Sequence, residues 1–236
     1  MNYKRILLKL SGESLAGKEG QNFDVSMIDL YAHEIKEAVD MGTQVGIVLG
    51  GGNIFRGLKG NNVGIDRVQG DYMGMLATVI NSLALQAALQ NIGIKACVLS
   101  GMEVSPVAER FSSAKAIEKL TNKEVVIIAG GTGNPFFTTD TAAALRAVEI
   151  HADVLLKGTR VDGVYTADPE KDKNAVKFDK LTFDEAYEKG LSIMDLTAFT
   201  MCSENKMPVV VFDVHKKGNL PAILKGNTCG TLIEAK

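Results

Sequence analysis

Three glycine-rich turns have the composition of phosphate-binding loops. They occupy residues 11–12, 50–53 and 130–134, and each follows directly after a short run of apolar residues. Glycine lets the backbone adopt positive φ angles and approach a ligand closely, so successive N–H groups can converge on phosphate oxygens. A single glycine pair could equally be a tight turn between a strand and a helix. Two dense clusters at the ends of apolar runs favour phosphate binding.

Two familiar nucleotide-binding motifs are nearly matched but fail at one position each. A GxxxxGK stretch ends at Lys18, but Glu19 stands where a Walker-type loop needs a hydroxyl for magnesium, and its carboxylate would repel phosphates. The cluster at residues 50–52, followed by Asp71, resembles a dinucleotide fingerprint, yet Phe55 occupies the place of the last glycine. A P-loop NTPase and a Rossmann dehydrogenase are both disfavoured.

Phosphoryl transfer depends on cations that neutralise the migrating group and on a carboxylate that orients them. Lys9 lies inside an apolar run, where an ammonium group is costly without a partner or a bound anion. Arg56 follows the triple glycine and could bind phosphate oxygens with two N–H groups. A solvent-exposed lysine at a strand end and an exposed loop arginine remain equally open. For Asp140, at the start of a predicted helix over residues 142–148, spacing alone favours helix capping.

The elements that position these residues alternate between apolar runs and helical patterns. Strands are predicted at residues 5–10, 45–49, 96–99, 125–129, 154–156 and 209–212, and the alternation indicates a parallel sheet. A helix is predicted from Ser26 to Met41, with a capping-box-like start and a stop at Gly42, and another begins at Thr182. The fold class is therefore α/β, with an open, mainly parallel central sheet and helices on both faces. Residues 1–236 form a single domain.

Two further segments carry predictions of their own. Residues 72–89 read as a buried helix, which Asn81, Ser82 and Gln86 interrupt too often for a membrane span. The polar stretch at residues 168–180 is expected to be a loop or hairpin, too short to separate two domains.

Composition excludes several classes of protein. Lys plus Arg number 26 against 28 for Asp plus Glu, so bulk charge indicates neither a nucleic-acid binder nor a membrane-surface binder, and an anionic ligand must be held locally. The three cysteines form no CxxC pair, which argues against a disulfide framework and a zinc site. No signal peptide or spanning helix is expected at the N-terminus. A cytoplasmic location fits these features.

Five motifs resemble those of the bacterial uridylate kinases of the amino-acid kinase superfamily, over nearly the whole chain. They are KLSGE at residues 9–13, GGGNIFRG at 50–57, GDYMGMLA at 70–77, GTGNPFFTTD at 131–140 and VDGVYTADP at 161–169. The first and last are shared loosely across the superfamily, and the middle three are specific to the uridylate branch. The resemblance implies an amino-acid kinase-like fold and transfer of the γ-phosphoryl group of ATP to UMP, giving UDP and ADP in pyrimidine nucleotide biosynthesis. Mg²⁺ would be carried by the nucleotide phosphates, with no protein ligand assigned.

The resemblance also implies a role for each matching residue. Lys9 and Asp140 would be catalytic, with Asp195 a weaker candidate for the same neighbourhood. ATP would be bound by Lys9, Leu10, Ser11, Gly12, Gly52, Arg56, Thr159, Tyr165 and Asp168. UMP would be bound by Gly51, Asp71, Thr132, Gly133, Asn134, Pro135, Phe136, Phe137, Thr138 and Thr139.

Two of these roles have ordinary structural alternatives. Asp71 would accept hydrogen bonds from the ribose hydroxyls, although its position alone favours a helix-start acid. Tyr165 would lie beside adenine, although by spacing it is an ordinary strand aromatic.

The same resemblance implies a homohexamer that UTP inhibits and GTP activates. The GTP effect would involve Gly17, Lys18, Glu19, Gly20, Gln21 and Asn22, whereas residues 102–119 match no pattern of the family. Two other functions remain open. A superfamily relative that phosphorylates a carboxylate or carbamate would share Lys9 and the loop at residues 162–169 but need no ribose acid at Asp71. A non-catalytic nucleotide sensor would tolerate the loss of Lys9.

Overall fold

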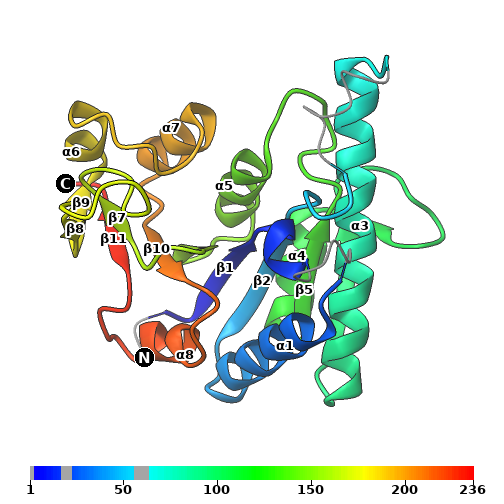
Figure 1. Ribbon diagram of the computed structural model, residues 1–236. Helices are drawn as coiled ribbons and strands as arrows, with labels where there is room; N and C mark the ends of the chain where they lie inside the picture. Colours follow the sequence, from blue (N-terminus) through cyan, green and yellow to red (C-terminus); the bar gives the residue numbers. More distant parts are fainter. Residues whose placement is uncertain (1–2, 17–22, 56–63) are drawn as a thin grey trace.

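The centre of the protein is a nine-stranded sheet, formed by strands in the part of the chain that the structure describes (Figure 1). The structure is a computed structural model and describes residues 3–16, 23–55 and 64–236. Arg56 and the effector segment at residues 17–22 lie outside these ranges. The strands of the sheet are β1 (Arg5–Leu10), β2 (Gln44–Leu49), β3 (Ala96–Ser100), β4 (Glu109–Arg110), β5 (Val125–Ala129), β6 (Val154–Thr159), β9 (Lys180–Thr182), β10 (Val209–Asp213) and β11 (Thr231–Glu234).

The spatial order of the strands is β4-β3-β5-β2-β1-β6-β10-β11-β9, and neighbours are parallel except for β10 and β11. This confirms the predicted open, mainly parallel sheet, and every predicted apolar run is a strand of it. Strand β1 lies in the middle, between β2 and β6, and its interior residues are buried because helices cover both faces. The ends of three parallel strands that precede glycine turns therefore meet at one edge of the sheet.

The strands that the sequence did not reveal are short. Strands β4, β9 and β11 have two to four residues, too few for a readable apolar run. A separate antiparallel pair consists of β7 (Val164–Tyr165) and β8 (Lys177–Phe178). It encloses most of the polar stretch at residues 168–180, and this confirms the predicted loop or hairpin.

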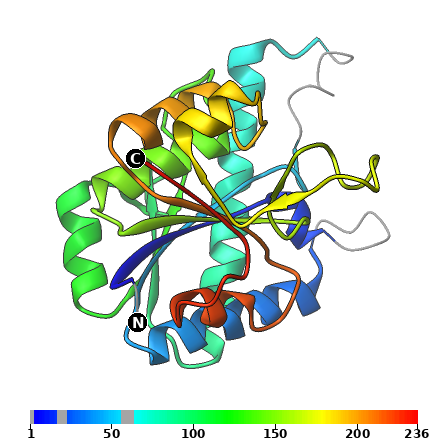
Figure 2. The ribbon, with the colours of Figure 1, turned by 90° about the vertical axis from the view of Figure 1, so that its left-hand side faces the viewer.

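Helices cover both faces of the sheet, as predicted. One apolar cluster unites the sheet with α1, α3 and α8, and a second unites it with α4, α5, α6 and α7. Figure 2 shows α1 and α8 together on one side of the sheet and α6 and α7 on the other. The helices are α1 (Val25–Asp40), α3 (Arg67–Asn91), α4 (Ser113–Thr121), α5 (Thr139–Glu149), α6 (Phe183–Glu188), α7 (Leu196–Glu204) and α8 (Asn219–Leu224), with a 3₁₀ turn, η1 (Gly12–Leu15).

The helix starts follow local hydrogen-bonding chemistry. The predicted capping box at Thr182 is confirmed, since its hydroxyl accepts from the backbone of Glu185 while the Glu185 carboxylate accepts from the Thr182 N–H. The predicted start of α1 at Ser26 is wrong. Asp24 is the cap and accepts the Ser26 N–H at 2.9 Å, because an aspartate satisfies a first-turn N–H at least as well as a serine.

Helix α3 is the long helix alongside the sheet in Figure 1, and it is only half buried. The prediction of a buried helix over residues 72–89 is therefore wrong for one of its faces. That face carries large apolar side chains with 36–47% of their surface exposed: Val68, Tyr72, Met73, Leu76, Ile80 and Leu83. By length and composition α3 alone among the described helices could cross a membrane, a test that core helices of soluble proteins also pass. Its other face packs onto the sheet.

Candidate active site

The first two glycine turns pack against each other at the carboxyl ends of β1 and β2. The Gly50 N–H donates to the Leu10 carbonyl at 2.9 Å, which extends the β1–β2 ladder into the turns. A Cβ atom on Gly12 would lie 2.6 Å from the Gly50 carbonyl oxygen and 2.7 Å from the Gly52 nitrogen. Only glycine fits at this crossing, so the two turns form one unit.

The third turn follows β5 and depends on glycine for its conformation. Gly133 has a φ of +85°, and a Cβ atom there would lie 2.4 Å from the Gly101 carbonyl oxygen. The Arg146 guanidinium donates to the Gly131 carbonyl at 3.0 Å and so supports the turn from α5. Beyond the turn, the Thr132 hydroxyl accepts the Asn134 N–H at 3.2 Å. All three turns thus lie at the same edge of the sheet, as the sequence predicts.

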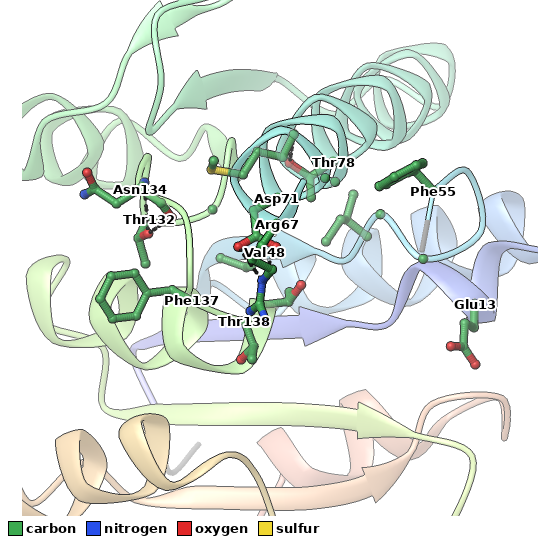
Figure 3. Close-up of a pocket in the computed structure, with 18 of the residues that line it drawn as sticks. Glu13, Val48, Phe55, Arg67, Asp71, Thr78, Thr132, Asn134, Phe137 and Thr138 are labelled. Atoms are coloured by element: carbon green, nitrogen blue, oxygen red, sulfur yellow. Dashed lines mark hydrogen bonds and ion pairs between the residues drawn. The ribbon is translucent and has the colours of Figure 1, made fainter. Parts of the chain in front are cut away.

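A cavity of about 850 Å³ opens between these turns and the N-terminal half of α3 (Figure 3). This volume suits a nucleotide-sized ligand. Residues assigned to UMP or ATP in the sequence line it: Gly51, Gly52, Asp71, Thr132, Asn134, Phe137, Thr138 and Thr139. The wall also includes Gly131 of the third glycine turn. The other lining residues were not singled out as ligand-binding by the sequence: Glu13, Val48, Leu49, Phe55, Asp66, Arg67, Gly70, Gly74, Met75 and Thr78.

Asp71 lies in the cavity wall on α3 and is already held by two groups. Its carboxylate accepts the Arg67 Nε–H at 2.9 and 3.0 Å and the Phe136 N–H at 2.7 Å. The helix begins at Arg67 with Asp66 as its cap, so the capping alternative for Asp71 is wrong. Figure 3 shows Asp71 and Arg67 side by side in the middle of the cavity, between the Thr132 loop and Phe55.

The bond to Asp71 also stabilises an uncommon backbone conformation. Phe136 has a φ of +73°, and Arg67 lies over its ring at 5.7 Å. Asp71 therefore links α3 to the loop that follows the third glycine turn.

Beside the cavity, Asp140 lies between two lysines. The Lys9 Nζ is 2.9 Å from its Oδ1 and the Lys157 Nζ is 2.5 Å from its Oδ2. The Lys157 contact is a hydrogen bond, whereas the Lys9 contact is a charge contact outside hydrogen-bond geometry. Their side chains are 13%, 18% and 12% exposed for Lys9, Asp140 and Lys157. The cluster therefore carries one net positive charge in a place largely shielded from water.

Electrostatics inside this cluster shift two of its groups. Burial alone would raise the pKa of Asp140, but the ammonium groups of Lys9 and Lys157 outweigh burial and hold that pKa below its ordinary value. Burial lowers the pKa of Lys157, and repulsion from Lys9 adds to that shift against the attraction of Asp140. The carboxylate is therefore ionised at neutral pH.

Asp140 is not the cap of α5, and the capping alternative that spacing favoured is wrong. Thr138 caps the helix and accepts the N–H groups of Asp140 and Thr141 at 3.1 and 3.2 Å. This leaves the Asp140 carboxylate free to turn toward the lysines. The Thr138 hydroxyl donates to Asp195, which caps α7 and also accepts from the Thr141 hydroxyl at 3.0 Å. Asp195 thus lies in the same neighbourhood but contacts threonines rather than lysines.

The remaining residues assigned to ATP lie apart from the cavity wall, around the end of β6 and the β7–β8 pair. The Thr159 hydroxyl donates to the Val161 carbonyl at 2.6 Å, and the Tyr165 hydroxyl donates to Asp162 at 2.5 Å. Asp168 is exposed and accepts the Glu170 N–H at 3.0 Å. The lining of the cavity likewise does not include Lys9, Leu10, Ser11, Gly12, Gly133, Pro135 and Phe136, although Lys9 contacts Asp140.

Sequence reasoning missed Lys157. It lies at the end of an apolar run whose predicted strand stopped one residue earlier, and it pairs in register with Lys9 on the neighbouring parallel strand. A second lysine interrupting a buried strand next to a glycine was the available signal. Among the described residues, no group of three His, Cys, Asp or Glu side chains could hold a metal ion, and both Asp140 oxygens face ammonium groups.

Comparisons with known proteins agree with this arrangement. The family model described as "Amino acid kinase family" matches residues 4–213. A protein named uridylate kinase from Bacteroides thetaiotaomicron is 59% identical over 231 residues, covering 98% of each chain. A crystal structure of UMP kinase from Bacillus anthracis aligns with a TM-score of 0.96 at 38% identity, covering 99% of this chain and 97% of that one. One of UMP kinase from Ureaplasma parvum aligns with a TM-score of 0.94 at 35% identity, covering 99% and 100%.

The match extends over nearly the full length in sequence and in structure, and it confirms the resemblance that the five motifs indicate. The chain belongs to the amino acid kinase family and, within it, to the uridylate kinases.

Proposed function

We propose that this chain transfers the γ-phosphoryl group of ATP to UMP, giving ADP and UDP for pyrimidine nucleotide biosynthesis. The observation that carries the proposal is the position of the Lys9–Asp140–Lys157 cluster, beside a nucleotide-sized cavity whose wall contains Asp71. Relatives named uridylate kinase at 59% identity support the choice of acceptor. One domain spanning residues 1–236 performs the reaction.

UMP occupies the cavity. The Asp71 carboxylate accepts the ribose hydroxyls, and the backbone and hydroxyls of the Thr132–Thr139 stretch bind uracil and the acceptor phosphate. That stretch comprises Thr132, Gly133, Asn134, Pro135, Phe136, Phe137, Thr138 and Thr139. Gly51 adjoins the same ligand and lines the cavity wall.

ATP lies on the other side of the cluster, over β1 and β6. The turn formed by Leu10, Ser11 and Gly12, with Gly52 and Arg56, holds the phosphates, while Thr159, Tyr165 and Asp168 hold the nucleoside. Lys9 lies between the two halves, since it is on β1 and contacts the first turn of α5.

The reaction is a direct in-line displacement. A UMP phosphate oxygen attacks the γ-phosphorus, the new oxygen–phosphorus bond forms, and the bond to the β–γ bridging oxygen breaks with its electron pair leaving on ADP. The acceptor is already anionic, so no strong base and no covalent enzyme intermediate are required. Lys9 and Lys157 neutralise charge on the moving group, and Asp140 holds their ammonium groups in place.

Mg²⁺ accompanies the nucleotide phosphates. Among the residues described, no carboxylate cluster offers a cage, and Asp140 is engaged by two cations, which supports a metal held mainly by phosphate oxygens and water. Magnesium would supply further charge neutralisation on the phosphates.

A homohexamer in the cytoplasm is the proposed form of the enzyme, inhibited by UTP and activated by GTP through residues 17–22. The exposed apolar face of α3 supports self-association, because it has no charged side chain between Tyr72 and Leu83. Light scattering on Ile80→Glu tests the assembly and should give a smaller particle than wild type, with Val25→Glu, at an exposed β-branched residue of another helix, as control. An initial rate that does not change as GTP is titrated would contradict the proposed activation by GTP.

A coupled ADP-release assay across nucleoside monophosphates tests the function itself. UMP should support rapid turnover, and Lys9→Met should abolish it. Equal turnover of CMP and UMP would overturn the assigned specificity. Turnover of a carboxylate or carbamate in place of UMP would identify the other branch of the superfamily, and no turnover of any acceptor would indicate a sensor.

A further inference from the structure

The inner face of α3 carries polar side chains at full depth in the core. Thr78 is 6% exposed, and Asn81 and Ser82 are 0% exposed. Buried polar groups are costly unless they are hydrogen-bonded, so their partners indicate what they are for. Ser82 donates to the Thr78 carbonyl at 2.7 Å within the helix, whereas Thr78 and Asn81 reach outside it.

Asn81 holds the second glycine turn by three hydrogen bonds. Its Nδ2 group donates to the Gly50 carbonyl and to the Asn53 Oδ1, both at 2.7 Å. The Asn53 Nδ2 group returns a bond to the Asn81 Oδ1 at 3.1 Å. A reciprocal amide pair of this kind fixes both side chains, because each amide uses its donor and its acceptor on the other.

This bonding extends to the first glycine turn. Gly50, held through its carbonyl by Asn81, donates its own N–H to Leu10. A Cβ atom on Gly12 would lie 2.7 Å from the Asn53 Oδ1, so Asn53 and Gly12 are packed together without spare room. A shift of Asn81 would therefore move both turns, which carry Gly12 and Gly52, assigned to the phosphates of ATP, and with the second turn also Gly51, assigned to UMP.

One turn earlier on the same face, Thr78 holds the third glycine turn. Its hydroxyl accepts the Gly130 N–H at 2.8 Å and donates to the Met75 carbonyl at 2.6 Å. Thr78 thus anchors the third turn, assigned to UMP, while Asn81 anchors the turns that carry Gly12 and Gly52, assigned to ATP. The separation between the two anchors is set by the helix itself, since residues three apart lie on one face.

We infer that Asn81 is a positioning residue for phosphoryl transfer, acting through Gly50 and Asn53 on the ATP-side turns, and that α3 sets the distance between donor and acceptor by anchoring the opposite turn at Thr78. Asn81 is not among the residues that line the cavity, so it would act through the turns. This inference rests on the assignment of the turns at Gly12 and Gly50 to ATP.

Steady-state kinetics on Asn81→Ala test it, with KM for ATP and for UMP measured separately. Misplacement by about 1 Å can cost on the order of a hundredfold in rate, so kcat should fall by roughly ten- to a hundredfold. KM for ATP should rise by more than KM for UMP, because two of the displaced residues, Gly12 and Gly52, are assigned to ATP and only Gly51 to UMP. Thr78→Val should show the reverse selectivity, with the larger change in KM for UMP.

Two further variants separate positioning from folding. Ser82→Ala removes an equally buried hydroxyl that bonds within the helix, and it should leave both KM values unchanged. Asn53→Ala removes the reciprocal amide from the turn without opening the core of α3, and it should reproduce the ATP-side defect even where Asn81→Ala folds poorly.

The outcomes distinguish this inference from the proposed function. Unchanged KM for ATP and unchanged kcat in Asn53→Ala and folded Asn81→Ala, with Lys9→Met inactive, would overturn the positioning role alone. Equal rises in both KM values would also contradict it, because that pattern indicates general loosening. An active Lys9→Met variant would instead overturn the site assignment.

Discussion

Lys9 and Lys157 are register partners on the adjacent parallel strands β1 and β6, and their ammonium groups converge on one carboxylate. Two ammonium groups side by side repel each other, and this repulsion adds to burial in lowering the pKa of Lys157. Asp140 offsets that repulsion, and the excess positive charge is available to an anion.

Replacing the shared carboxylate should damage both activity and stability. Asp140→Asn keeps the shape of the side chain but leaves two buried ammonium groups without their counterion. Breaking a buried ion pair in this way costs about 3–5 kcal/mol, so the free energy of unfolding from urea titration should fall by that order. The rate should fall by at least about a hundredfold, since the lysines are no longer held in place.

A surface ion pair provides the control for Asp140. Lys180 and Glu234 pair with side chains 60% and 35% exposed, and Glu234→Gln should change stability by no more than about 1 kcal/mol. An Asp140→Asn variant as stable and as active as this control would contradict the role given to the cluster.

The decrease in the free energy of unfolding at acidic pH should depend on Asp140. The pKa of Asp140 lies below its ordinary 3.8, so its contribution is fully present above that value and is lost as pH falls through the folded-state pKa. The stability difference between wild type and Asp140→Asn should therefore narrow as urea titrations move below about pH 4. A difference that stays constant down to pH 2 would show that ionisation of Asp140 contributes nothing.

The fall of kcat at alkaline pH should reflect deprotonation of Lys157. Its pKa lies below the ordinary 10.5, so its ammonium group is lost before a free lysine would titrate. Because the unfolded state then binds more protons in that range, this group makes stability rise with pH while activity falls. Lys157→Arg, which stays charged, should move the alkaline limb of kcat upward. If Lys157→Arg leaves the alkaline fall of kcat unchanged, that fall belongs to another group.

Asp71 should matter to the acceptor and not to the donor. Asp71→Ala removes the ribose acceptor and releases the Phe136 N–H, so KM for UMP should rise by roughly a hundredfold while KM for ATP stays nearly constant. Asp40→Ala removes an exposed i,i+4 partner of Lys36 and is the matched control. Parallel rises in both KM values would place Asp71 outside the acceptor site.

Arg146 should stabilise the third glycine turn. It donates to Gly131 at 3.0 Å and to Glu149 at 2.6 Å, and it lies 4.3 Å from the centre of the Phe111 ring. Arg146→Met should lower the free energy of unfolding by roughly 1.5–3 kcal/mol, because hydrogen bonds to a charged group are lost. KM for UMP should rise as well. An unchanged KM for UMP would show that the support Arg146 gives to the turn does not affect ligand binding.

Much of this fold could be predicted because its strands are long apolar runs. Apolar runs predict strand β1 and its neighbours, and glycine clusters indicate where these strands end. Strand β4 has two exposed residues and forms only because Ser100 and its neighbours are already placed by β3. No local pattern could reveal it.

The candidate site, too, could be predicted from the sequence only in part. Motifs predict roles for Lys9 and Asp71. However, Asp140, which contacts Lys9, and Phe136, which contacts Asp71, come from distant segments. Lys157 is 148 positions from Lys9 and meets it only through the register of two strands. Thr138, Thr139 and Asp140 are all residue types that cap helices, so only the structure shows that Thr138 is the cap.

The structure of the chain bound to UMP and a non-hydrolysable ATP analogue tests the central claim most directly. The account predicts uridine in the cavity against Asp71, the ATP phosphates over the turns at Gly12 and Gly52, and the γ-phosphoryl position within hydrogen-bond reach of Lys9 and Lys157. Either nucleotide bound away from these turns, or a γ-phosphoryl group out of reach of both lysines, would contradict it.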